Sequence, residues 1–337
     1  TDGTQAVLAA TKVIRNHPDQ TNAVVNSLNL LDSLSYIPQN CDTMLENGTV
    51  DVVAKLMKEN ATNLDVAVPA TRLLEVISNE KERAEQLPKK NATRPIIKAV
   101  PKLLPLEDPE AITALRSILA TLDNVADTEE GQVALAKQGA VPAIFAAMEA
   151  HSDDPQMIKY ANQAIAKLVT DDDVIAVLNK LKGYDPAAIP TMSPDKLAKI
   201  AKDVHQLGLL LMSGDFASLV EEHGGIPMLA GIMQAAEQHE DCPEKENLMN
   251  ELVKAFGRAA DNINPQDALP VVPILLNGLQ DGDEEMLRAI ANLARDPDTL
   301  KAMTNAGAVA TLMPLLESNL TEPESLPAIL MALAPLA

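Results

Sequence analysis

Apolar residues recur every three or four positions along most of the chain, which is the spacing of one face of an α-helix. The stretch from Asp283 to Ser318 shows this pattern in its most compact form. We expect a helix from about Glu284 to Ala294, a short helix from Thr299 to Asn305 and a third helix beginning at Val309. A proline separates the first two helices and Gly307 ends the second, because proline suits a first helical turn and glycine suits a helix end.

The same order of a short helix, a glycine and an apolar helix recurs elsewhere. The openings fall at Gly48, Gly139, Gly225 and Gly307, and intervening units begin near Asn91, Gly183 and Asn264. The glycines are roughly 80–90 residues apart, about twice the length of a 40–47-residue helical repeat. Such a unit cannot bury its apolar faces alone, so we expect neighbouring units to stack. Residues 183–194 contain three prolines, and there we expect a shortened second helix or a loop.

Two segments carry a family resemblance. Residues 291–296 (ANLARD) and 305–309 (NAGAV) resemble the junction between two armadillo repeats. The resemblance implies an all-α, right-handed superhelical solenoid of about seven armadillo-like three-helix repeats. It would cover residues 1–337 as a single array whose first and last repeats are incomplete. A HEAT array of two-helix repeats is the main alternative, and it would lack the short helix before each glycine.

The amino-acid composition favours packed helices, and the net charge disfavours some classes of binding partner. The chain is 47% hydrophobic but only 2% aromatic, with no Trp, which favours close helix packing over a β-sandwich. Its net charge of −21 disfavours direct binding to nucleic acid and to anionic membrane surfaces. This charge is compatible with basic protein partners, although it is also what solubility alone would require.

The cysteines bear on the cellular compartment, and the two ends of the sequence bear on whether it is part of a longer protein. Cys41 and Cys242 form no cluster, so we expect a reducing, cytoplasmic location. The armadillo resemblance leaves association with the cytoskeleton open as well. No apolar run approaches the roughly 20 residues that span a bilayer. The chain begins within a helical pattern at Thr1, so we interpret it as a segment of a longer protein. The apolar end from Ile329 to Ala337 predicts that further repeats or a partner cover it.

The resemblance also implies a surface for partners. In armadillo proteins the third helices line a concave face, and in importin-α-like members Asn and Trp residues there hold an extended basic peptide. At the corresponding position only Asn124 and Asn292 keep the family residue, and Trp is absent. An importin-type groove is therefore not expected. The alternative role for both asparagines is a hydrogen bond to a neighbouring loop that fixes repeat stacking.

Two cations occupy the same position in other third helices. Lys167 and Arg258 would meet acidic segments of a partner. The alternative is an ion pair with a helix-end carboxylate such as Asp171 or Asp261. Together with Asn124 and Asn292, they are the candidate partner-binding residues.

No catalytic, metal or cofactor site is expected. The runs Asp171–Asp173 and Asp281–Glu285 lack the ligand spacing of a calcium loop, and helix capping explains both. The His239–Cys242 segment is metal-like in composition but crowded, so we interpret it as a solvated loop. No phosphate-binding loop or hydrolase motif occurs in the sequence.

The sequence thus predicts a non-catalytic scaffold or adaptor that binds proteins, basic or extended segments among them, through its concave surface and open ends within a larger assembly. The armadillo resemblance implies two alternatives, which remain open: a regulator or chaperone of small GTPases or myosin, and a structural subunit of a cytoskeletal or flagellar assembly.

Overall fold

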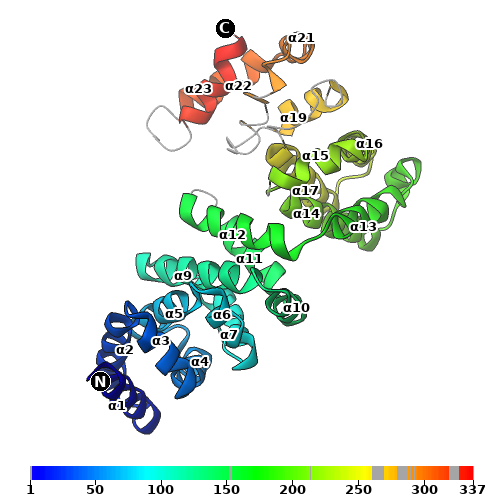
Figure 1. Ribbon diagram of the computed structural model, residues 1–337. Coiled ribbons are helices and arrows are strands. Elements are labelled where there is room, and N and C mark those ends of the chain that lie inside the picture. The colour runs from blue at the N-terminus through cyan, green and yellow to red at the C-terminus, as the bar shows by residue number, and fades with distance from the viewer. Residues whose placement is uncertain are drawn as a thin grey trace. The chain divides into compact units, whose positions relative to one another are not determined.

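The chain is helical throughout its described part. The computed structural model describes residues 2–151, 154–212, 214–259, 269–278, 287, 290–291, 293–318 and 326–336. These residues form α-helices and 3₁₀-helices joined by turns, with no strand among them, so the prediction of an all-α fold is confirmed. The chain divides into two compact units, Thr1–Val169 and Thr170–Ala337, each of which is described by itself (Figure 1).

The helices of the first unit follow one another with short connections. They are α1 (Asp2–Asn16), α2 (Thr21–Ser35), α3 (Pro38–Glu46), α4 (Thr49–Asn60), α5 (Leu64–Ser78), α6 (Lys81–Ala84), α7 (Gln86–Lys89), α8 (Thr93–Leu103), α9 (Pro109–Ala126), α10 (Glu129–Gln138), α11 (Ala140–Ala150) and α12 (Pro155–Leu168). The longer helices begin where the apolar periodicity begins in the sequence, which is why their existence could be predicted.

These helices pack in two rows. One row contains α1, α4, α8 and α11 in succession, and the other contains α2, α5, α9 and α12. Each helix of the first row also packs against the next helix of the second row, as α4 does against α5. The apolar faces between the rows are fully buried, for example at Leu28, Leu73 and Ile118. Burying such a side chain stabilises the fold by about 1.5–3 kcal/mol, so each helix depends on its neighbours.

A residue with positive φ precedes each later helix of the first row. Gly48 (φ 75°) precedes α4, Asn91 (φ 53°) precedes α8, and Gly139 (φ 77°) precedes α11. Glycine adopts this left-handed backbone without steric cost, and asparagine tolerates it better than most residues. The positions predicted as openings of repeats are therefore the places where the backbone turns sharply.

The second unit contains α13 (Asp171–Lys182), η1 (Pro186–Thr191), α14 (Pro194–Leu211), α15 (Gly214–Glu222), α16 (Gly225–Glu237), α17 (Pro243–Ala259), η2 (Leu269–Val271), α19 (Val272–Gly278), α21 (Pro297–Asn305), α22 (Ala308–Ser318), α23 (Leu326–Leu333) and η3 (Ala334–Leu336). Helices α14 and α17 pack along much of their length. Positive φ recurs at Gly224 before α16 and at Gly307 before α22.

The irregular stretch predicted at residues 183–194 is a short 3₁₀-helix. This element, η1, packs against α16, and its Ile189 is fully buried. Proline is frequent here, and it removes the backbone donors that a longer α-helix would need. A short 3₁₀-helix with one buried apolar side chain thus stands where a shortened second helix or a loop was expected.

Some sequence predictions fall at the edge of the described part. The helix expected from Glu284 to Ala294 is described only at residues 287, 290–291 and 293–294, and its apolar members Ile290 and Leu293 are buried. The acidic run 281–285 and the opening near Asn264 lie outside the described residues. Among the described helices, none combines the length and the apolar character that crossing a membrane requires.

Candidate functional site

The asparagine predicted to bind a partner is used inside the fold. Asn124, near the end of α9, donates from Nδ2 to the hydroxyl of Ser78 (3.0 Å) and to Oδ1 of Asn79 (3.1 Å) at the end of α5. These bonds join two successive helices of one row, which is the stacking role considered as the alternative. Asn292, the matching residue, lies outside the described residues.

Lys167 of α12 is also engaged with its own chain. Its Nζ lies 2.6 Å from Oδ1 of Asp123 and 2.7 Å from Oδ1 of Asp127, both near the end of α9. The ion pair with a helix-end carboxylate is therefore formed, but with the preceding helix of the row and not with Asp171. Burial raises the pKa of the Asp123 carboxyl although Lys167 opposes this change.

Arg258 of α17 lies against α14. A Cβ atom placed on Gly208 would be 3.4 Å from its Nη1 atom, so the guanidinium occupies space that the glycine leaves open. Asp261, the carboxylate suggested as its partner, lies outside the described residues. Of the four candidate residues, Asn124 and Lys167 are therefore both engaged by other residues of the first unit.

The acidic segment Asp171–Asp173 lies at the start of a helix, where it contributes a cap. Thr170 and Asp173 form a capping box at the start of α13, in which each side chain accepts a bond from the other residue's backbone. No group of three or more His, Cys, Asp or Glu side chains suited to a metal ion occurs among the residues that the structure describes.

A basic groove between α4 and α8 is the most distinctive surface feature. Its volume is about 800 Å³, and six of its lining residues are cationic: Lys55, Lys58, Lys90, Arg94, Lys98 and Lys102. Asp51 is the single acidic residue of the lining. Because the whole chain carries a net charge of −21, this concentration of positive charge is a strong local exception.

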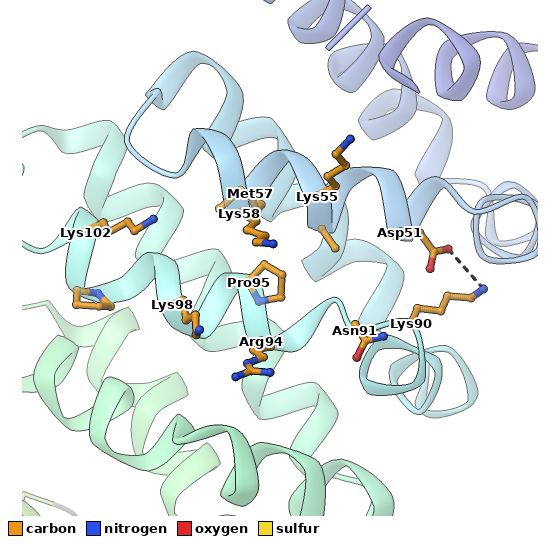
Figure 2. A pocket seen from close by; sticks show the side chains of 12 residues that line it. Asp51, Lys55, Met57, Lys58, Lys90, Asn91, Arg94, Pro95, Lys98 and Lys102 are labelled. Atoms are coloured by element: carbon orange, nitrogen blue, oxygen red, sulfur yellow. Dashed lines mark ion pairs between the residues drawn. The ribbon is translucent and has the colours of Figure 1, made fainter. Parts of the chain in front are cut away.

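Helical spacing groups most of these cations on one face of their own helix. Lys55 and Lys58 lie three residues apart on α4, while Arg94, Lys98 and Lys102 lie four residues apart on α8. Residues with these spacings share one helix face. Figure 2 shows Lys58 pointing toward α8, with the three cations of α8 following one another along that helix.

The groove has an apolar floor. Ala54 and Met57 of α4 are buried beneath it, and Pro95 of α8 is half-buried across from them. Asn91 lies at the end of the groove, where its left-handed backbone turns the chain into α8. The arrangement therefore combines an apolar base with exposed cations above it.

The charges of the groove are mostly not neutralised by this chain. Lys90 lies 3.8 Å from Asp51, the one ion pair drawn in Figure 2. Within the described ranges, none of the other five cations has a carboxylate within ion-pair distance. Like charges four residues apart on a helix destabilise it by about 0.2–0.5 kcal/mol per pair. A bound anion would reduce this repulsion.

The basic groove was not predicted from the sequence. The signal in the sequence was the four-residue spacing of Arg94, Lys98 and Lys102 in an otherwise acidic chain. The cations of α8 lie beside the lysines of α4 because these two helices pack together. The helices are more than 30 residues apart in the sequence, so spacing within one helix cannot show this contact.

Comparisons with known proteins give no family. No family model matches the chain, and no curated protein matches it. Solved structures that resemble it include two engineered proteins of the Northeast Structural Genomics Consortium. The first shares 20% identity at a TM-score of 0.42, covering 98% of this chain and 88% of the other. The second shares 20% identity at a TM-score of 0.31, covering 86% of this chain and 96% of the other.

Proposed function

We propose that this chain is a non-catalytic protein-interaction scaffold, built as an armadillo-like helical solenoid, that binds acidic segments of partner proteins in the basic groove between α4 and α8. The observation that carries the proposal is the set of five cations without a carboxylate partner in a chain of net charge −21. The two rows of helices and the recurring left-handed residues support the armadillo-like architecture.

An acidic peptide fits the groove better than a nucleic acid does. None of the groove's lining residues is aromatic, so there is no platform on which bases could stack. A nucleic acid carries a charge at every nucleotide and would extend over the acidic remainder of the surface, whereas a peptide can confine its carboxylates to the groove. The apolar floor formed by Ala54 and Met57 also suits the side chains between carboxylates.

The proposed binding surface lies on the row of helices opposite to the one predicted from the sequence. Asn124 and Lys167, on the row that contains α9 and α12, are occupied by contacts within the fold. The cations of α4 and α8 lie on the opposite row. A reducing, cytoplasmic location accords with the two free thiols, Cys41 and Cys242.

The test is direct binding of a fluorescein-labelled peptide that contains four consecutive Asp or Glu residues, measured by polarisation at low and high salt. We expect binding that weakens as salt rises, because exposed charge contacts are screened. The double variant Lys98→Glu/Lys102→Glu should lose this binding. The matched control is Lys196→Glu/Lys199→Glu on α14, where both lysines are exposed and the change in net charge is the same.

Three results would overturn the proposal. Absence of binding by the unmodified chain would remove its basis, and equal losses in both double variants would show that the groove is not the site. Tighter binding of a single-stranded RNA oligonucleotide, abolished by Lys98→Glu/Lys102→Glu, would assign the groove to nucleic acid instead.

A further inference from the structure

A second depression lies on the other side of α8. It has a volume of about 320 Å³ and is formed by α8 and α11, which pack side by side. We call it the apolar hollow; its lining includes Ile97, Pro101, Gly139, Pro142, Ala143 and Ala146. The single charged residue of its lining is Lys98. Its character is thus opposite to that of the basic groove.

The basic groove and the apolar hollow meet on α8. Lys98 and Pro101 belong to the lining of both, so α8 forms one wall of each. Both residues are exposed, as are Gly139 and Pro142 across the hollow. A Cβ atom placed on Gly139 would meet no atom within 4 Å, which shows that the rim of the hollow is open there.

We propose that the basic groove and the apolar hollow bind one extended segment of a partner protein, in which an acidic block is followed or preceded by a single apolar side chain. The acidic block lies between α4 and α8, the segment crosses α8 at Lys98 and Pro101, and the apolar side chain enters the hollow. This inference rests on the proposed function, because it assumes that the groove takes an acidic peptide.

Geometry sets the spacing within that segment. Packed helices lie about 8–10 Å apart, so the two depressions are separated by about one helix spacing. An extended peptide advances about 3.3 Å per residue. The apolar residue is therefore about three positions from the nearest carboxylate. The small side chains of Ala143 and Ala146, both half-buried, leave room for a side chain of the size of Leu.

Pro101 adds a feature that favours an extended peptide. Proline has no N–H, so it cannot make the bond to the Ile97 carbonyl that an α-helix would form at this position. Ile97 itself belongs to the lining of the hollow. Its carbonyl oxygen therefore lacks its usual intrahelical donor, and a backbone N–H of a segment crossing α8 would supply one.

The experiment compares two labelled peptides with the same block of four acidic residues. One carries Leu three positions beyond the block, and the other carries Ser there; a second pair places the block after the test residue. We expect the better Leu peptide to bind about tenfold tighter than its Ser partner, which is the gain from burying one such side chain. The variant Ala146→Leu should abolish this gain by filling the hollow.

The matched control is Ala150→Leu, an exposed position on the same helix outside the hollow, which should keep the tenfold preference. Equal affinities for the Leu and Ser peptides would overturn the two-part segment while leaving the acidic groove in place. A preference for Leu that survives Ala146→Leu would also overturn it, because the apolar side chain would then bind elsewhere. If neither peptide binds, the proposed function itself fails.

Discussion

Lys167 on α12 and Asp123 on α9 are joined by a hydrogen-bonded ion pair in which Nζ and Oδ1 are 2.6 Å apart. Asp123 is only 8% exposed, so the pair holds a carboxylate that would otherwise lack compensation inside the first unit. Lys167 is therefore occupied by this contact, which joins the stacked helices α9 and α12.

Replacing this lysine should destabilise the first unit. Lys167→Met leaves Asp123 buried without its cation, at an expected cost of about 2–3 kcal/mol in the free energy of unfolding at neutral pH. Because burial raises the pKa of Asp123, the cost should shrink as pH falls through that raised value, where the carboxyl becomes neutral. Urea unfolding of the variant and the unmodified protein at several pH values measures both effects.

The double variant Asp123→Asn/Lys167→Met is the control, and it should recover most of the lost stability. A cost that stays constant between neutral and acidic pH would contradict the role assigned to this pair.

Asn124 should contribute to stability and not to binding. Asn124→Ala removes the bonds to Ser78 and Asn79 and should cost about 1–2 kcal/mol of unfolding free energy. The control is Thr113→Ala on the same helix, whose hydroxyl bonds only the backbone of its own helix, to Pro109. Loss of acidic-peptide binding in folded Asn124→Ala would show that this row of helices takes part in recognition after all.

Two glycines of the second unit should respond in opposite ways to the same substitution. Gly224, with φ 68°, and Gly231, inside α16, both have open space where a Cβ would lie. Gly224→Ala should destabilise by about 1 kcal/mol because of backbone strain alone. Gly231→Ala should stabilise by about 0.5–1 kcal/mol because alanine favours a helix.

Thermal unfolding of these two variants gives the comparison without a change in side-chain contacts. Changes of the same sign in both would show that the left-handed turn before α16 is not a constraint on this unit.

His239 should make a local contact depend on pH. Its two ring nitrogens lie 2.7 Å from the carbonyl oxygen of Glu240 and 2.9 Å from that of Met192. Carbonyls accept only, so the protonated ring satisfies both, and these bonds raise the pKa of His239. The contribution to stability is therefore complete below the unfolded pKa of about 6.5 and is lost as pH rises through the higher folded value.

NMR titration of the ring, with hydrogen exchange at Met192 and Ile189 beside it, measures this change. In His239→Asn, the protection of these amides from exchange should no longer vary with pH across the titration range of His239, once the intrinsic pH dependence of amide exchange is subtracted. A pKa at or below the ordinary value for histidine would contradict the expectation.

Some features could be predicted from the sequence because they depend on local chemistry. The glycines at 48, 139 and 307 were expected at helix ends and have positive φ, as does Asn91 in place of a glycine. The opening expected at Gly225 has its left-handed residue one position earlier, at Gly224, because two adjacent glycines give the sequence no means of choosing. The short helix expected from Thr299 begins two residues earlier, at Pro297, since Asp296 caps it.

Features that depend on neighbouring helices could not be predicted. The partner of Lys167 was sought at the next helix start, but the carboxylates lie in the preceding long helix of the same row. The basic groove requires α4 to lie beside α8, and nothing in either helix alone specifies this neighbour. The repeat count and the superhelical hand remain predictions.

The charge contrast between the basic groove and the rest of the chain also bears on kinetics. A chain of net charge −21 repels an acidic segment on average, whereas the cations of α4 and α8 attract it locally. Such a field acts beyond the range of contact and orients two molecules during their first encounter. The groove would thus orient its partner before contact, so that a partner reaching the groove would already be aligned for binding.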